Sequence, residues 1–171
     1  MRRLASAAVL TGLMASPAAA AELNLSVEIP RMSVAEYHNP YVAIWVEKPD
    51  QTAVKTLAVW YDIKLRNQEG ETWLKDMRQW WRRAGRAMTL PADGVSGATK
   101  APGRHQVKFV AGKAPLGTLP AGQYNLVVEA AREVGGREMV RIPFQWPPKA
   151  AATGQAKGET ELGAVSLSLK P

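Results

Sequence analysis

The amino-acid sequence predicts a mainly β protein, an antiparallel sandwich with one inserted amphipathic helix. Three observations lead to this prediction. Several short segments alternate apolar and polar residues, which is the period of a half-buried strand. Turn residues separate these segments at intervals that are typical of sandwiches. Strand and helix patterns do not alternate along the chain, which disfavours a parallel nucleotide-binding sheet.

Residues 1–21 have the three parts of a secretory signal peptide. Arg2 and Arg3 form the positive end, residues 4–14 are the apolar part, and the alanines at 19–21 give the cleavage site. The apolar part is too short to span a membrane as a helix, which takes about 20 residues. We therefore expect export to the periplasm, with no transmembrane segment after cleavage.

Three strands are expected in the first part of the mature chain. Residues 22–29 alternate apolar and polar side chains, and Pro30 ends this strand. Residues 41–46 and 54–61 are two further strand-like runs. The Lys-Pro-Asp-Gln segment at 48–51 favours a turn between them, because proline presets the first dihedral angle of a turn. We expect these two runs to form a hairpin.

Residues 72–86 have the period of a helix rather than that of a strand, with Thr72 as the expected N-cap. At 100° per residue, the apolar face gathers Trp73, Met77, Trp80 and Ala84, with Trp81 at its edge. The opposite face gathers Lys75, Arg78, Arg82 and Arg86. We expect Trp73 and Trp80 to pack the helix onto the sandwich. Residues 90–102, which contain several Pro and Gly, are expected to form a loop.

The rest of the chain returns to strand patterns. Residues 104–110, 123–132 and 137–146 are expected strands, and Gly135-Gly136 favours a hairpin turn between the last two. The expected organisation is a signal peptide, a β-sandwich domain, a linker and a C-terminal strand, at residues 1–21, 22–146, 147–157 and 158–171.

Composition excludes several classes of chemistry. The chain has no cysteine, so disulfides, iron–sulfur clusters, c-type haem and a thiol nucleophile are excluded. Two histidines make a histidine-rich metal site improbable, and we assign no metal ligand and no catalytic residue. The formal charge of +7 becomes +5 when Arg2 and Arg3 leave with the signal peptide. An exported protein does not meet genomic DNA, so we expect no nucleic-acid partner.

The expected loop after the helix contains the run Asp-Gly-Val-Ser-Gly-Ala-Thr, which ends at Thr99. This run resembles the acceptor motif at which FMN is joined to proteins through a threonine phosphoester, as in the flavin-carrying subunits of sodium-pumping quinone reductases. The resemblance implies that Thr99 is the attachment residue and that Asp93, Ser96, Gly97 and Ala98 are recognised by a flavin transferase. That separate exported enzyme uses FAD and magnesium. A glycine-rich surface turn without a chemical role is the alternative interpretation.

Three further residues belong to the expected flavin environment. Lys100 and Arg104 adjoin the phosphate that the motif implies, and Trp81 is the better candidate for stacking on a flavin ring. The basic face of the expected helix has four open roles: it can stabilise a reduced flavin, contact anionic lipid, contact an acidic partner or simply face solvent.

Most of residues 22–146 resembles the family of predicted periplasmic proteins called domain of unknown function 2271. The resemblance rests on the segments 40–47, 80–82, 95–104 and 128–133. It implies a setting beside PepSY-type membrane reductases and flavin transferases, often in iron uptake. The run Leu-Pro-Ala-Gly-Gln-Tyr at 119–124 resembles part of the immunoglobulin-like module of flagellar hook-capping proteins, which makes the expected sandwich immunoglobulin-like.

Two functions follow as hypotheses. The first is an exported redox protein that carries covalent FMN on Thr99 and relays electrons between a membrane reductase and a periplasmic acceptor. Such a protein would be an electron carrier more than a stand-alone enzyme, because the cofactor supplies the redox chemistry. The alternative is a non-catalytic immunoglobulin-like binding or assembly module, which predicts a large exposed apolar or aromatic patch.

Overall fold

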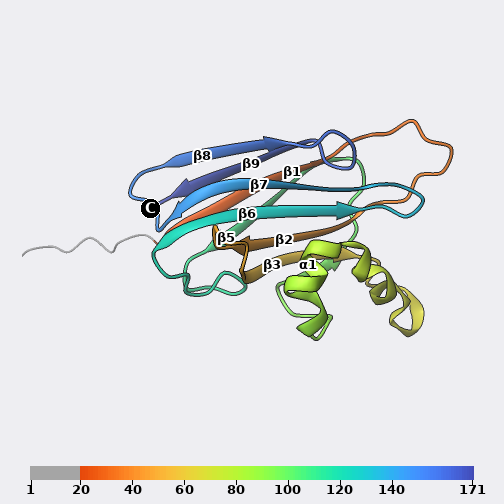
Figure 1. Ribbon diagram of the computed structural model, residues 1–171, viewed down its shortest axis with the longest axis horizontal. Helices are drawn as coiled ribbons and strands as arrows, with labels where there is room; N and C mark the ends of the chain where they lie inside the picture. Colours follow the sequence, from red (N-terminus) through yellow and green to blue (C-terminus); the bar gives the residue numbers. More distant parts are fainter. Residues whose placement is uncertain (1–19) are drawn as a thin grey trace, which may run out of the picture.

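The computed structural model describes residues 20–171, so most of the expected signal peptide lies outside the described residues. Nine strands in this range form two sheets that pack face to face (Figure 1). The first sheet has the order β5 (Gly103–Val110), β1 (Glu22–Ile29), β9 (Ala164–Lys170) and β8 (Ala152–Lys157). The second has the order β4 (Ser96–Ala98), β3 (Ala53–Tyr61), β2 (Tyr41–Glu47), β6 (Gly122–Ala131) and β7 (Arg137–Trp146).

The topology is that of an immunoglobulin-like sandwich. The order β3-β2-β6-β7 matches the C′-C-F-G sheet of variable domains, and β1 pairs with β5 as strand B pairs with strand E. The C-terminal β9 lies on the other side of β1, in the place that the N-terminal strand A takes in immunoglobulin domains. Every pairing is antiparallel except that of the short β4 with β3. The expected sandwich is confirmed.

The main core lies between the two sheets, and strand alternation produces it. Leu23, Leu25, Val27 and Ile29 of β1 are at most 1% exposed, and their polar neighbours face outward. On β2, Val42, Ile44 and Val46 point into the same core, whereas the residues between them point to the opposite face of the sheet. Both faces of β2 are buried, because a second layer covers the outer face of the second sheet.

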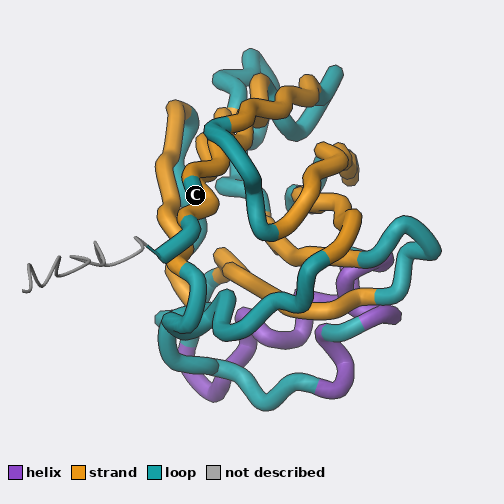
Figure 2. Tube along the Cα trace, turned by 90° about the vertical axis from the view of Figure 1, so that its left-hand side faces the viewer, coloured by secondary structure: helices purple, strands orange, loops and turns teal. Residues whose placement is uncertain are grey.

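That second layer is a helical segment of three short pieces, namely η1 (Arg66–Asp76), α1 (Arg78–Arg83) and η2 (Gly85–Ala87). Figure 2 shows this segment gathered on one side of the strands. It buries Leu74, Met77 and Trp80 against the outward residues of the sheet, among them Ala43 and Trp45. The molecule therefore has three layers, two sheets and a helical cover.

Several expectations need correction. One continuous helix over 72–86 is wrong, because Met77 leaves helical geometry with ψ at 71° and separates a 3-10 segment from α1. Thr72 is no N-cap, because it lies inside the 3-10 segment, which Leu65 precedes as the N-cap residue. A loop over 90–102 is wrong for residues 96–98, which form β4. A linker over 147–157 is wrong for its second half, which forms β8 and pairs with β9 inside the sandwich.

Other expectations are confirmed. The strands at 22–29 and 137–146 have the bounds that the sequence predicts. The hairpin between β2 and β3 forms, and its turn is closed where the Lys48 N–H donates to the Thr52 carbonyl at 2.9 Å. The Tyr124 hydroxyl at the start of β6 donates to the Pro120 carbonyl at 2.8 Å. Pro120 lies four residues before Tyr124, and this contact is the tyrosine corner of immunoglobulin-like sandwiches.

Candidate functional site

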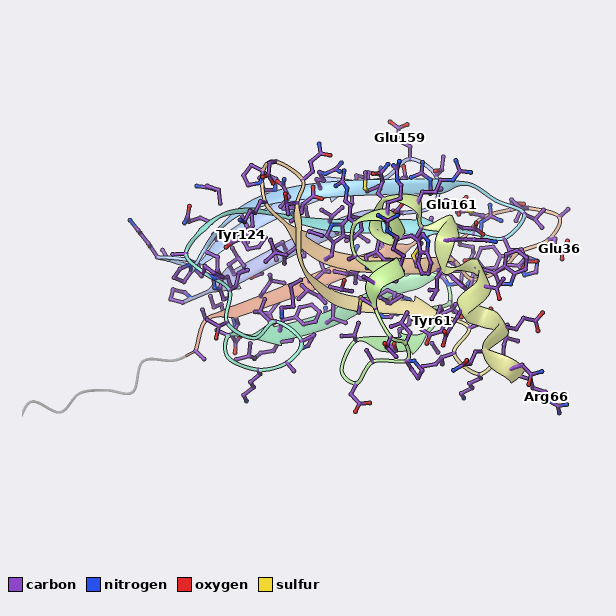
Figure 3. The ribbon with its side chains drawn as sticks, turned by 60° about the horizontal axis from the view of Figure 1, so that its bottom comes forward. Glu36, Tyr61, Arg66, Tyr124, Glu159 and Glu161 are labelled. Atoms are coloured by element: carbon purple, nitrogen blue, oxygen red, sulfur yellow. The ribbon has the colours of Figure 1, made fainter. Side chains whose placement is uncertain are left out.

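A cavity of about 340 Å³ lies at one end of the second sheet, beside the end of β3, the start of β2 and the end of β6. It is lined from the strand ends by Asn39, Tyr41, Asp62, Thr99, Ala131 and Arg132, and from the surrounding segments by His38, Leu65, Trp73, Asp76, Glu133 and Val134. Its volume falls in the range of small-molecule sites. Figure 3 labels Tyr61, Glu36 and Glu161 at this end of the sandwich, away from Tyr124 at the other.

Strand pairing explains why distant residues meet here. Ala98 is opposite Tyr61, and Tyr41 is opposite Ala131. The rings of Tyr41 and Tyr61 meet edge to face, with centroids 6.3 Å apart. Thr99, which directly follows β4, is therefore three strands away from Arg132, which directly follows β6. Neighbouring strands lie about 4.8 Å apart, so these two residues mark a span of about 14 Å across the sheet.

Exposed apolar side chains line part of the cavity. Four large hydrophobic residues within 20–171 are exposed, and three of them line this cavity: Leu65 at 43%, Trp73 at 48% and Val134 at 73%. Single exposed hydrophobic residues are ordinary, but a group around a cavity marks a binding surface. The expectation that Trp73 packs the helix onto the sandwich is wrong, whereas Trp80 is fully buried as expected.

Thr99 is half-buried at one end of the cavity. Its backbone N–H donates to the Tyr61 carbonyl at 3.2 Å, which continues the β3–β4 pairing by one residue. Its hydroxyl donates to Oδ1 of Asp62 at 3.3 Å. Burial raises the pKa of the neighbouring Tyr41 to about 12, so that this phenol stays protonated at neutral pH. The threonine hydroxyl is thus bonded to a carboxylate and lines the same cavity as Tyr41.

Arg132 forms the other end of the cavity, and its side chain is 6% exposed. Nε donates to Oε2 of Glu161 at 2.8 Å and Nη2 donates to Oε1 at 3.2 Å, so the guanidinium is held by a buried carboxylate. The same Oε1 accepts the Gly136 N–H at 2.7 Å. Nη1 of Arg132 is buried and has no hydrogen-bond partner within residues 20–171. The guanidinium carbon lies 5.9 Å from the centre of the Tyr37 ring.

The residues that the acceptor motif implies lie on one segment, 93–99, but make different contacts. Ser96 accepts the Ala92 N–H on its hydroxyl at 3.0 Å and closes the turn before β4. Gly97 lies flat against Trp60, where an added Cβ would stand 3.3 Å from the ring. Ala98 is exposed at the sheet edge. Asp93 is exposed and lines a different hollow. Only Thr99 of this group lines the cavity described above.

The other three residues of the expected flavin environment lie elsewhere. Lys100 places its ammonium 5.5 Å from the centre of the Trp60 ring. Arg104 pairs with Glu28 across 3.8 Å on the first sheet. Trp81 is partly buried beside Trp80, with ring centroids 6.2 Å apart. None of the three lines the cavity that contains Thr99, whereas Trp73 does.

Sequence reasoning missed a pair of buried carboxylates under the helical segment. Glu47 and Glu129 are 0% exposed on the outer face of β2 and β6. The Glu47 carboxylate forms ion pairs with the guanidinium groups of Arg83 and Arg141, each at 2.7 Å. The Glu129 carboxylate forms one with Arg137 at 3.0 Å. A glutamate inside the apolar run of an expected strand is the signal that could have revealed Glu129. Of these ion pairs, Arg83–Glu47 joins α1 to the sheet, whereas Arg137 and Arg141 belong to β7.

Two structural tests bear on binding and location. Within residues 20–171, no group of three or more His, Asp or Glu side chains is placed to hold a metal ion. Over the same range, no helix has the length and apolarity needed to cross a membrane.

The comparison with protein families gave one match. The model of a family described as predicted periplasmic protein, domain of unknown function 2271, matches residues 22–164. This description agrees with the periplasmic location that the sequence predicts. Comparisons with curated proteins and with solved structures gave no significant match.

Proposed function

The chain belongs to the family of predicted periplasmic proteins called domain of unknown function 2271, and we propose that it is a periplasmic electron carrier with FMN joined to Thr99. The observation that carries the proposal is that this threonine lines a cavity that exposed apolar side chains, Trp73 among them, also line in part. A motif threonine on a featureless turn would have given no such support. The resemblance of residues 93–99 to the FMN acceptor motif and the family setting also support a flavin carrier.

The residues present fit a tethered flavin. Thr99 would hold the phosphoester, while Tyr41 and Trp73 would offer aromatic surface to the ring. The span of about 14 Å between Thr99 and Arg132, estimated from strand spacing, suits a long ligand held at one end. When bound, the flavin would accept and release electrons.

Charge around the cavity indicates how the protein would tune such a cofactor. Asp62, Asp76 and Glu133 line the cavity, and the positive charge of Arg132 is already matched by Glu161. Carboxylates oppose additional negative charge nearby. We therefore expect them to disfavour the reduced, anionic form and to lower the midpoint potential. Because Asp62 is exposed, it can turn to solvent and reduce its repulsion with the phosphoester.

The proposed partners come from the family setting. An exported flavin transferase would attach the FMN, and a PepSY-type membrane reductase would supply electrons. The acceptor would be a periplasmic ferric ion or a ferric complex in iron uptake. The exposed rim at Leu65, Trp73 and Val134 is the surface at which such a partner would reach the cofactor.

Co-expression with a flavin transferase tests this proposal. The intact mass of the mature protein is expected to increase by FMN minus water, and the band is expected to fluoresce in a denaturing gel. Thr99→Ala should remove both signals. Thr89→Ala, which changes an exposed threonine in the preceding loop, is the matched control and should keep them. An unchanged wild-type mass beside an active transferase and a labelled carrier subunit would refute the proposal.

One observation also favours the second function, a non-catalytic binding module. The apolar rim is the exposed patch that such a module predicts. The two functions differ in the state of the protein in its native host. An unmodified mass there would favour the binding module, and a mass increased by FMN minus water would favour the carrier.

A further inference from the structure

The hydroxyl of Thr99 has a specific partner outside the motif. Its Oγ1 donates to Oδ1 of Asp62 at 3.3 Å, and this is the hydrogen bond that the side chain makes within residues 20–171. The two residues are 37 positions apart in the sequence. They meet because β3 and β4 run parallel, so that the residues after both strands emerge side by side. A motif search on the 93–99 segment alone would not find this carboxylate.

We infer that Asp62 is the proton acceptor for the modification of Thr99, an inference that rests on the proposed function. In the step, Oγ1 of Thr99 forms a bond to the phosphorus of FAD that carries the riboflavin part. The anhydride bond to the second phosphorus breaks, and AMP leaves with the electron pair. The hydroxyl proton passes to Oδ1 of Asp62 and later to water. A threonine hydroxyl is a weak nucleophile without an adjacent base.

The surroundings favour Asp62 over the other groups at the cavity. Asp76 and Glu133 line the same cavity, but neither bonds to the Thr99 hydroxyl. Tyr41, with its pKa raised to about 12, stays protonated and cannot accept a proton at neutral pH. An aspartate that accepts the proton of an attacking hydroxyl is also the arrangement used in protein kinases, there on the enzyme side. Here the acceptor protein would supply the carboxylate itself.

The exposure of Asp62 suits this role. Because Asp62 is exposed, water can take the transferred proton from it after the step. The exposed position also leaves space for the transferase to approach Thr99 from the same side. A distance of 3.3 Å is long for such a bond, and catalytic hydrogen bonds commonly shorten when the reacting complex forms.

The experiment measures the initial rate of FMN incorporation by intact mass, using unmodified full-length mature protein, purified transferase, FAD and magnesium. Asp62→Asn keeps an oxygen that accepts the Thr99 hydrogen bond but removes the base. We expect it to lower the maximal rate by about 100-fold, within the usual range for general-base catalysis, and to leave the KM for the protein within about twofold. Glu69→Gln, which changes an exposed carboxylate of η1 that does not line the cavity, should react at the wild-type rate.

The two kinetic constants separate a base from a docking contact. Loss of a docking contact would raise the KM for the protein, whereas loss of the base lowers the maximal rate at an unchanged KM. Circular dichroism and thermal unfolding confirm that each variant is folded. If the wild type is modified and Asp62→Asn reacts at the same rate, the inference about Asp62 is overturned but the proposed function is not. No modification of the wild type would overturn the proposed function instead, so the two failures are distinguishable.

Discussion

The carboxylate of Glu129 accepts the backbone N–H of Trp80 at 2.8 Å, a contact between residues 49 positions apart. It also accepts the Gln79 N–H at 3.1 Å. A strand of the second sheet thereby satisfies the first free donors of α1 and fixes where this short helix begins. The helical segment owes its position to buried charge on the sheet as well as to apolar packing, and four predictions follow from this and related contacts.

Glu129→Ala is expected to lower the free energy of unfolding by about 3 kcal/mol, because it leaves two helix N–H groups and Arg137 without their buried partner. Urea denaturation followed by tryptophan fluorescence measures the change. Glu159→Ala, at an exposed residue, is the control and should change stability by less than about 0.5 kcal/mol. A loss of equal size in both variants would contradict the role of Glu129.

Trp73 and Trp80 should respond oppositely to truncation. Trp80→Ala is expected to cost about 3–5 kcal/mol, because the ring is fully buried and its indole N–H donates to the Thr56 hydroxyl at 3.1 Å. Trp73→Ala should cost less than about 1 kcal/mol, because almost half of that side chain is exposed. Thermal unfolding of both variants provides the comparison. A Trp73 loss as large as that of Trp80 would mean that the rim is structural.

The contribution of Glu138 to stability should depend on pH. Burial opposes its ionisation, but the backbone N–H groups of Glu159, Leu162 and Thr160 outweigh that effect and hold the pKa of the Glu138 carboxyl below its usual range. A lowered folded-state pKa stabilises the protein above the unfolded pKa of about 4.3 and loses this effect as the pH falls through the folded value. The stability difference between wild type and Glu138→Gln should therefore be full near pH 6 and shrink below about pH 4.

Urea denaturation at several pH values checks this expectation. Asp50→Asn is a useful comparison, because the Asp50 carboxyl also has its pKa lowered, by the Thr52 N–H, but lies at an exposed turn. Its difference from wild type should be smaller at every pH. A Glu138→Gln difference that stays constant from pH 7 to pH 3 would contradict the prediction.

Tyr124→Phe tests the tyrosine corner by removing one hydroxyl. The ring is buried against Phe144, with centroids 5.8 Å apart, so packing should persist while the bond to Pro120 is lost. We expect a loss of about 1 kcal/mol, the net value of one hydrogen bond. Differential scanning calorimetry of the two proteins measures it, and an unchanged midpoint would mean that water replaces the lost contact without cost.

Short-range patterns account for the parts of the fold that sequence reasoning predicted. The strand at 22–29 follows from alternation, and the hairpin at 41–61 follows from two apolar runs around a proline turn. These features depend on neighbours in sequence. The prediction of a linker was wrong for its C-terminal half because the structure there depends on a distant part of the chain. Residues 152–157 are small or polar and largely exposed, and they become a strand because β9 offers them a free edge.

The helical segment shows why periodicity alone did not suffice. A 100° pattern over 72–86 places Trp73 and Trp80 on one face only if the chain stays helical between them. Met77 leaves helical geometry, and Glu129 fixes the start of α1 at the next residues. Trp73 then turns to the cavity rim while Trp80 enters the core. The outcome depends on a carboxylate about 50 residues away, which no local pattern contains.

By itself, the sequence determined a cysteine-free, mainly β chain with one candidate threonine, because composition and local alternation decide these properties. The tertiary structure decided which groups surround that threonine. It brought Asp62 and Tyr41 beside Thr99, placed Arg132 across the cavity, and moved Trp73 rather than Trp81 to the rim. The physical reason is that these residues emerge from different strands, and only the pairing of those strands makes them neighbours.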